Sequence, residues 1–245
     1  MTTIFGATPE WLSSSTTNAL SGIPTSSLIY AIDASRTLSY SSGANITDLT
    51  GSTVASSFTN GTYWEPADPT NGYVSSFVFD GSNDIITLNK AGNTSSPILL
   101  SCPWTCYFWV RTAAQDGAFF SHYSGGPVNN GMYINAGKLA YAYYDGQWNY
   151  VYSTGATVSD NQWKLITFTC PSSTTGAMKM YVNGVLDYSF TPRISWGSYN
   201  MGGIGSLWGF QYLNGRMSMM LVYNAEHSAT DVASMFTTTR KKFGI

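Results

Sequence analysis

From Leu28 to the C-terminus, turn-forming glycine pairs divide the sequence into short stretches rich in β-branched and aromatic residues. Asp80-Gly81, Asp145-Gly146 and Asn183-Gly184 are dipeptides of the kind that reverse a chain between two strands. The clearest strand candidates are residues 105–111, 163–170 and 216–223. Short strands at this spacing are typical of a β-sandwich or barrel. The sequence therefore predicts one all-β domain over residues 28–245.

Composition is consistent with a large core and narrows the function classes. The 245 residues are 43% hydrophobic and 15% aromatic, whereas charged residues make up only 10%, against about 25% in ordinary globular proteins. The net charge is -2, and no basic stretch is longer than residues 240–242, which excludes a surface that follows nucleic-acid phosphates. We expect no nucleic-acid partner.

The N-terminal sequence and the longest apolar runs bear on localisation. The start, MTTIFGATPEWL, lacks the charged and apolar regions of a secretory signal, and no window approaches 18 apolar residues. We therefore expect a chain that is not conventionally secreted and does not insert into a membrane. Residues 1–27 are polar and without periodicity, which predicts an arm ahead of the domain.

The cysteines and histidines are too few for a metal centre. Cys102, Cys106 and Cys170 can form at most one bridge, and we favour core or inert thiols. His122 and His227 cannot complete a zinc site at any standard spacing.

Two hairpins and one helix can be drawn from the sequence. A two-residue loop at Asp145-Gly146 would pair Tyr143 with Trp148, and it would place one set of aromatic side chains on a single face: Tyr141, Tyr143, Trp148, Tyr150 and Tyr152. The same reasoning at Asn183-Gly184 pairs Tyr181 with Leu186 and Lys179 with Tyr188.

Near the C-terminus, Ser228 and Asp231 have the spacing of a helix cap ahead of an apolar stripe formed by Val232, Met235 and Phe236. We expect this helix to plug an open end of the sandwich. Met217, Met219, Leu221 and Tyr223 should point to one face of the strand before it.

No arrangement of catalytic residues is found. A retaining glucanase needs two carboxylates about 5 Å apart, but Glu10, Glu65 and Glu226 lie in three different loop-like segments and no strand candidate carries two acids on one face. No Gly-x-Ser-x-Gly motif is present, and neither histidine has the context of a triad. We predict that the chain is not an enzyme.

Asp80, Asn83 and Asp84, in FVFDGSNDIITL, could supply oxygen ligands to calcium. Their spacing is not that of an EF-hand and supplies too few ligands, so we favour a tight turn in which Asp80 and Asn83 bond local amides. We expect no metal and no cofactor, with calcium at this turn as the alternative.

Exposed aromatic side chains are the candidates for contact with a glycan, because flat rings stack on sugar rings and tyrosine hydroxyls reach polar groups. The aromatic face of the 139–152 hairpin is one candidate, but large aromatics on one face of a sheet are more often core, and we favour that position for it. We therefore select residues near turns and in loops: Tyr144, Trp64, Trp196 and Tyr199.

The order of motifs resembles the laminin-G-like branch of the concanavalin A-like lectin/glucanase superfamily. The matching segments are LIYAIDASRTLSYSSGANITDLTG, FVFDGSNDIITL, TCYFWVR, DNQWKLITFT, MYVNGVL and LNGRMSMMLVYNAEHSATDVASMF. The resemblance implies a jelly-roll sandwich of two antiparallel sheets with a short C-terminal helix, and Trp163 packed in the core. The segments DAS, DLTG and the RKKFGI tail are similar to laminin-G-like proteins of virus particles, particularly of tailed phages.

This resemblance leads to two functional hypotheses. The first is a non-enzymatic virion decoration protein, made in the host cytoplasm and bound to capsid, tail or fibre proteins through an arm whose apolar contacts are Trp11, Leu12 and Ile23. The second is a lectin module that attaches to host-surface glycans. Assembly into a homo-oligomer is compatible with both.

Overall fold

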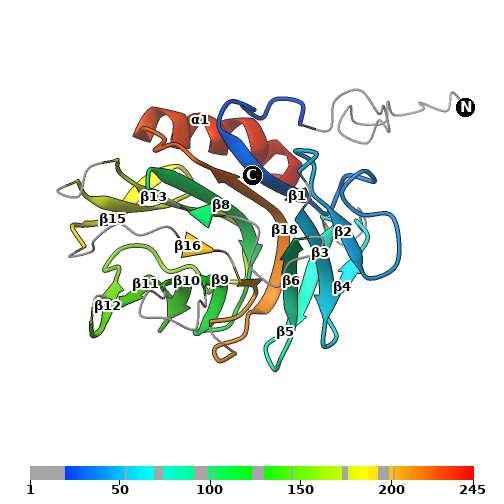
Figure 1. Cartoon of the computed structure of the whole chain (residues 1–245), viewed down its shortest axis with the longest axis horizontal. Helices are drawn as coiled ribbons and strands as arrows, with labels where there is room; N and C mark the ends of the chain where they lie inside the picture. The colour runs from blue at the N-terminus through cyan, green and yellow to red at the C-terminus, as the bar shows by residue number, and fades with distance from the viewer. Residues whose placement is uncertain are drawn as a thin grey trace, which may run out of the picture.

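The computed structural model describes residues 20–52, 54–68, 74–90, 99–100, 102–122, 130–144, 146–172, 176–192, 199–200, 202–207 and 209–245. In this part of the chain two eight-stranded antiparallel sheets pack face to face (Figure 1). The predicted jelly-roll sandwich with a short C-terminal helix is confirmed.

Sheet A has the order β15-β14-β13-β8-β18-β5-β4, with β1 also paired to β18. Its strands are β1 (Leu28–Asp33), β4 (Tyr63–Glu65), β5 (Ser76–Asp80), β8 (Trp104–Arg111), β13 (Lys164–Cys170), β14 (Met178–Val182), β15 (Val185–Phe190) and β18 (Asn214–Tyr223).

Sheet B has the order β12-β11-β10-β9-β17-β6-β3-β2. Its strands are β2 (Asn45–Thr47), β3 (Val54–Thr59), β6 (Ile85–Lys90), β9 (Gly117–His122), β10 (Asn130–Asn135), β11 (Lys138–Tyr144), β12 (Trp148–Tyr152) and β17 (Gly203–Ile204). A separate pair joins β7 (Leu99–Leu100) to β16 (Tyr199–Asn200).

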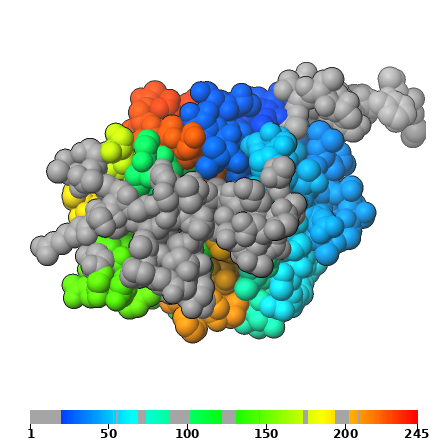
Figure 2. All heavy atoms as spheres, in the orientation of Figure 1, coloured from blue at the N-terminus to red at the C-terminus, as the bar shows by residue number. Residues whose placement is uncertain are grey.

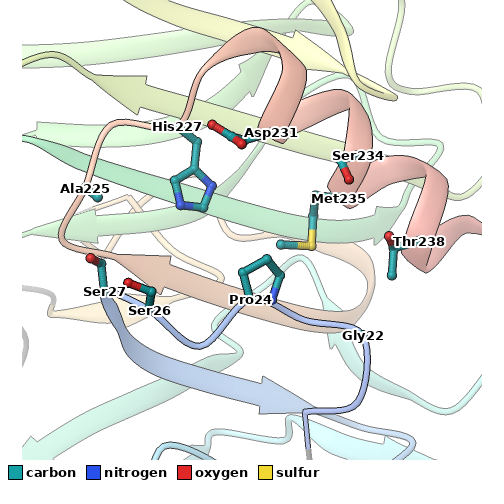
Figure 3. Close-up of a pocket in the computed structure, with 10 residues that line it drawn as sticks. All are labelled: Gly22, Pro24, Ser26, Ser27, Ala225, His227, Asp231, Ser234, Met235 and Thr238. Atoms are coloured by element: carbon teal, nitrogen blue, oxygen red, sulfur yellow. The ribbon is translucent and has the colours of Figure 1, made fainter.

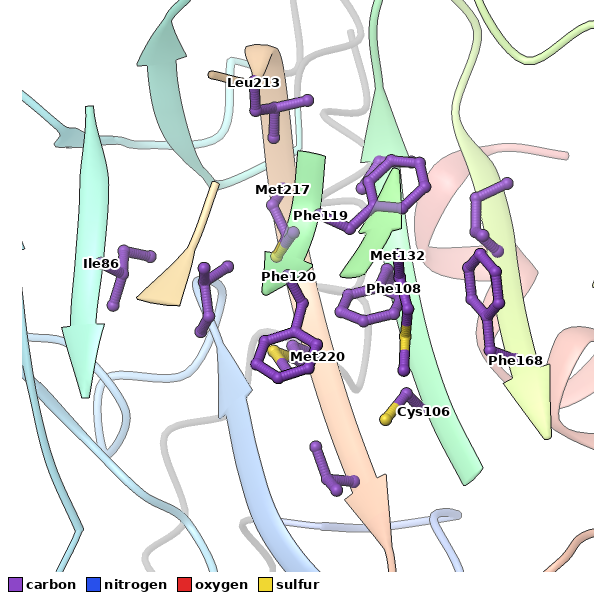
Figure 4. Close-up of a cluster of buried hydrophobic side chains, with 14 of the residues drawn as sticks. Ile86, Cys106, Phe108, Phe119, Phe120, Met132, Phe168, Leu213, Met217 and Met220 are labelled. Atoms are coloured by element: carbon purple, nitrogen blue, oxygen red, sulfur yellow. The ribbon is translucent and has the colours of Figure 1, made fainter. Parts of the chain in front are cut away.

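The main core lies between the sheets, because side chains alternate along each strand and one set from each sheet points inward. Phe108 of β8 stacks on Phe119 of β9 with ring centroids 5.6 Å apart. Figure 4 shows aromatic, aliphatic and sulfur-containing side chains filling this space. The other face of β8 is also buried, since Tyr107 and Trp109 lie under the C-terminal segment.

That segment consists of the helix α1 (Ala229–Thr239) and the 3₁₀ helix η2 (Arg240–Phe243). Ser228 caps α1 through a reciprocal pair of hydrogen bonds with Asp231, as the sequence predicted. The expected position is wrong, however. The helix covers the outer face of sheet A and does not plug an end of the sandwich (Figure 1), because its buried side chains pack on the outward side chains of β8 and β18.

Two β-bulges change the predicted side-chain directions. A register shift between Met217 and Met219 in β18 sends Met217 into the main core, whereas Met219 points toward α1. In the β14–β15 hairpin, Tyr181 pairs with Leu186 as predicted. A shift after Met180 then pairs Lys179 with Ser189, which corrects the predicted pairing of Lys179 with Tyr188.

Cys102 and Cys170 form a disulfide across a sequence separation of 68 residues, which corrects the expectation that both are unbridged thiols. Cys170 is the last residue of β13 and pairs with Trp104, the first residue of β8, so the bridge lies where these two strands meet. Cys106 is a buried free thiol in the main core, and its burial raises its pKa.

Both ends of the described chain lie against sheet A. Leu20 and Ile23 pack on the cluster under α1, and the Tyr223 hydroxyl donates to the Pro24 carbonyl at 2.9 Å. At the C-terminus, Lys242 donates to Asp33 at 2.5 Å. Burial alone would raise the pKa of Asp33, but the Lys242 ammonium outweighs it and holds that pKa below its usual value. None of the helices in the described part of the chain has the length and apolar character that crossing a membrane requires.

Candidate functional site

The β11–β12 hairpin has a different register from the one predicted. Tyr144 pairs with Trp148, Tyr143 with Asn149 and Tyr141 with Val151, so the loop has three residues instead of two. A shift of one residue moves every side chain of a strand to the opposite face. Trp148, Tyr150 and Tyr152 therefore lie on the outer face of sheet B, and the prediction that they share the face of Tyr141 and Tyr143 is wrong.

Burial shows the consequence of this register directly. Tyr141 and Tyr143 are buried in the main core, whereas Trp148, Tyr150 and Tyr152 are 39%, 49% and 46% exposed. The last three, together with the half-buried Tyr144, form what we call the aromatic platform.

The rings of the platform support one another. Trp148 and Tyr150 are near parallel, with centroids 6.2 Å apart and an interplanar angle of 21°. Tyr144 meets Trp148 edge-on at 5.3 Å. Such contacts hold flat apolar surfaces in a fixed orientation toward solvent.

The sheet beneath the platform is apolar and tightly packed. Ala140 and Ala142 pair with Tyr152 and Tyr150, and both alanines are fully buried in a small cluster with Tyr133 and Leu207. Burial raises the pKa of Tyr133, and its hydrogen bond with Tyr152 acts in the same direction. The part of sheet B beneath the platform is therefore a buried, mainly apolar layer.

The chain after β12 is anchored to sheet A. Asp187 of β15 accepts hydrogen bonds from the Ser153 hydroxyl and, at 2.5 Å, from the Ala156 amide. This carboxylate holds together the β12 and β15 edges of the two sheets.

The structure places the four predicted glycan-contact residues very differently. Tyr144 belongs to the platform. Trp64 lies on β4, half-buried, where its indole N–H donates to the Ala34 carbonyl at 2.8 Å and its ring packs 5.3 Å from Tyr40. Trp196 lies outside the described residues, and for Tyr199 only the backbone, in β16, is described. Trp148, Tyr150 and Tyr152 were left out of the selected residues because the sequence favoured a core position for their face, and they are exposed instead.

The acidic segment around Asp80 is a turn that crosses from sheet A to sheet B. Asp80 accepts from the Ser82 amide at 2.7 Å, and Gly81 has a φ of 83°. The buried Asp84 accepts from the Asp80 amide at 2.8 Å, and burial raises its pKa. Asn83 accepts from Asn60 through its backbone carbonyl. Among the described residues no cluster of three metal-ligating side chains is found.

The predicted arm is only partly described. Trp11 and Leu12 lie outside the described residues, whereas Ile23 packs on its own domain, in the cluster under α1. A contact of Ile23 with a partner stays a prediction.

A hollow lies between residues 22–27 and α1, with a volume of about 270 Å³. Figure 3 shows His227, Asp231, Ser234 and Thr238 around it. The Tyr107 hydroxyl lies 2.7 Å from Nδ1 of His227. Burial lowers the pKa of His227, and the Asp231 carboxylate offsets part of this effect.

Two of the three glutamates hold ion pairs. Glu65 pairs with Arg216 between β4 and β18, and Glu226 accepts from Lys179 at 3.0 Å. Glu10 lies outside the described residues. Each described glutamate is thus engaged by a basic side chain of its own.

The comparison with protein families decides the relationship. A family model described as "Concanavalin A-like lectin/glucanases superfamily" matches residues 80–233, more than half of the chain. The chain belongs to this superfamily. The match runs from the turn at Asp80 to the middle of α1 and includes the whole platform of this concanavalin A-like domain.

Solved structures show the same fold. The receptor-binding domain of botulinum neurotoxin D has a TM-score of 0.60 and 15% identity, covering 86% of this chain and 52% of that one. The serotype D ligand-binding domain in complex with N-acetylneuraminic acid has a TM-score of 0.58 and 16% identity, covering 87% and 51%.

Domain 4 of AbnA, an extracellular arabinanase from Geobacillus stearothermophilus, was solved in complex with arabinotriose. It has a TM-score of 0.62 and 17% identity, covering 85% of this chain and 97% of that domain. The concanavalin A-like domain thus spans about half the length of the neurotoxin structures and nearly all of the arabinanase domain. No curated protein sequence matches it.

Proposed function

We propose that this domain is a carbohydrate-binding module that contacts glycans through the aromatic platform. The observation that carries the proposal is the exposure of Trp148, Tyr150 and Tyr152 on one face of the edge strand β12. Soluble proteins seldom expose clustered apolar side chains to water, and such clusters often mark a surface that binds a ligand or a partner.

The chemistry of the platform suits a sugar. The apolar C–H face of a sugar ring can stack on the near-parallel rings of Trp148 and Tyr150. Tyrosine hydroxyls at the rim can exchange hydrogen bonds with the sugar hydroxyls. Two structural neighbours, solved with N-acetylneuraminic acid and with arabinotriose, support sugar binding on this fold.

A glycan array tests the proposal. We expect wild-type protein to bind a defined set of glycans and the variant Trp148→Ala/Tyr150→Ala to lose that binding. Tyr63→Ala is the matched control, because Tyr63 is 51% exposed but lies on β4 of sheet A. Equal binding by the double variant, or binding to no glycan, would refute the proposal. Reading the array with and without calcium also tests the alternative of a calcium site at Asp80 and Asp84.

The same geometry favours binding without catalysis. The ion pairs of Glu65 and Glu226 occupy the two described glutamates away from the platform. We expect purified protein to leave β-glucans unhydrolysed. Turnover that is lost on replacing an acidic residue would contradict this.

A second proposal concerns display on a particle, as a virion decoration protein. Residues 20–27 lie beside α1 against sheet A, whereas the platform lies on the outer face of sheet B. Figure 2 shows the N-terminal segment, in blue, next to the orange α1 at the top, and the green β11–β12 region at the lower left. Attachment through the N-terminal side would therefore leave the platform facing outward.

Truncation tests this proposal. Removing residues 1–19 should abolish incorporation into particles and leave the domain folded, because the packed segment that includes Leu20, Ile23 and Pro24 is retained. Particles banded on a gradient and assayed by mass spectrometry give the readout. Full incorporation of the truncated protein would refute attachment through this arm.

A further inference from the structure

A hollow of about 360 Å³ lies on the same outer face as the platform, over β6, β17 and β9. Thr87, Ser121 and Ser206 bring hydroxyl groups to its lining, Gly202 and Gly203 line it without side chains, and Ile85 adds an apolar wall. The Thr87 hydroxyl lies 2.9 Å from that of Thr59 on β3. We call this hollow the hydroxyl pocket. Among the described residues that line it, none carries an ionisable side chain.

The pocket and the platform lie on one continuous row across sheet B. Following the Cα partners from strand to strand gives the row Tyr150, Ala142, Gly131, Ser121, Gly203 and Thr87. Directly opposed residues share a face of the sheet. With neighbouring strands about 4.8 Å apart, the five steps from β12 to β6 span about 24 Å.

The middle of the row is low in side-chain bulk and is covered by a short turn. A Cβ at Gly131 would lie 2.0 Å from Cδ1 of Leu207, so the absence of a side chain there lets Leu207 settle on the sheet. Leu207 and Phe210 are joined by two backbone hydrogen bonds of 2.9 Å, and Phe210 is 66% exposed. The turn thus places another exposed aromatic ring on the loop that borders the pocket.

From this arrangement we infer that the hydroxyl pocket is a second sugar subsite, and that the glycan is a neutral, extended oligosaccharide crossing sheet B from the platform to the pocket. The inference rests on the proposed function and specifies its ligand. Hydroxyl and backbone groups complement sugar hydroxyls, which both donate and accept. An acidic sugar would need a cationic partner once desolvated, and the described residues of the row and the pocket lining include none.

The length of the proposed site determines how affinity should depend on the length of the oligosaccharide. A span of about 24 Å is longer than any single sugar, so a short oligosaccharide can occupy the platform without reaching the pocket. Affinity should therefore rise with chain length until both subsites are filled, since the second contact is made by a ligand already held at the first.

Titration with linear neutral oligosaccharides tests the inference. The probes are arabino-, cello- and laminari-oligosaccharides of increasing length. In the series that binds, we expect the longest member to bind wild type at least about tenfold more tightly than the shortest. Thr87→Trp, which fills the pocket, should abolish this gain, and Thr87→Val should reduce it.

Thr47→Trp is the matched control, because Thr47 is an exposed threonine on the same face of sheet B, in β2 at the opposite edge. It should behave as wild type, and equal urea midpoints confirm that all variants fold. Unchanged length dependence in Thr87→Trp would overturn the pocket as a subsite, while loss of binding in Trp148→Ala/Tyr150→Ala would still uphold the platform. Binding of acidic glycans alone would overturn the neutral ligand. No binding by wild type would overturn both.

Discussion

His227 is the residue whose ionisation should affect folding most clearly near neutral pH. Its Nδ1 lies 2.7 Å from the Tyr107 hydroxyl, and its ring centroid is 4.3 Å from that of Tyr223. Asp231 is the charged group near it on α1. Burial against β8 and β18 lowers the pKa of His227 below its ordinary value of 6.5 despite this carboxylate.

We predict that the free energy of unfolding falls as the pH drops below 6.5, the ordinary pKa of His227. The His227 side chain binds a proton more tightly in the unfolded chain than in the folded protein. Stability is therefore lost as the pH falls from 6.5 to the lowered pKa of His227 in the folded protein, by at most about 1.4 kcal/mol per pH unit. His227→Gln should flatten the profile in this window. Urea unfolding measured from pH 7 to pH 5 gives the answer, and equal profiles for His227→Gln and wild type would contradict it.

At the scale of elements, η2 ties the C-terminus to the outer face of sheet A. Phe243 is 7% exposed and stacks on Trp109 with centroids 3.9 Å apart. It also lies 5.0 Å from Trp163. The three rings join η2, β8 and the residue before β13 in one apolar contact.

Replacing Phe243 by alanine should lower the free energy of unfolding by about 3 kcal/mol, through lost burial and the cavity left beside Trp109. Ile245→Ala should change it by less than about 0.5 kcal/mol, since Ile245 is 46% exposed. Both values come from urea unfolding with an unchanged m-value. Similar midpoints for the two variants would show that η2 contributes little.

The strands and the cap of α1 could be predicted because their signals are local. Apolar alternation marks β8, β13 and β18, and the Ser228–Asp231 spacing is itself the capping geometry. The face that α1 covers could not be predicted, because it depends on which outward-facing side chains of sheet A are apolar, and the directions of those side chains follow from the strand register.

The site could be predicted only in part because register is not local. Both a two-residue and a three-residue loop fit the Asp145-Gly146 sequence, and the choice reverses every side chain of β12. The bulge in β18 has the same effect on Met217. Tyr144 was expected beside the turn and lies half-buried in the platform, whereas a core position was favoured for Trp148, Tyr150 and Tyr152, which are exposed.

The whole molecule has two unlike outer faces. Sheet A is covered by α1, η2 and residues 20–27, and sheet B carries the platform and the hydroxyl pocket. One covalent link, Cys102–Cys170, closes a loop of 68 residues that contains β9 to β12 and therefore the platform strands. Disulfides of this kind are typical of oxidising surroundings.

Reduction of this bridge should lower the free energy of unfolding by about 2–4 kcal/mol, because the unfolded chain regains the freedom of the long loop. Urea unfolding with and without reductant measures the difference. Alkylation of the unfolded, unreduced chain should modify one cysteine, Cys106. Modification of all three cysteines would contradict the bridge.

Fluorotryptophan NMR tests the central claim most directly, with the Trp148 resonance assigned through Trp148→Phe and the glycan selected on the array added to the protein. Binding at the platform should shift the Trp148 resonance and leave the buried Trp104 and Trp109 unchanged. A shift at Trp64 or Trp196 with Trp148 unaffected would contradict the account and place the site away from β12.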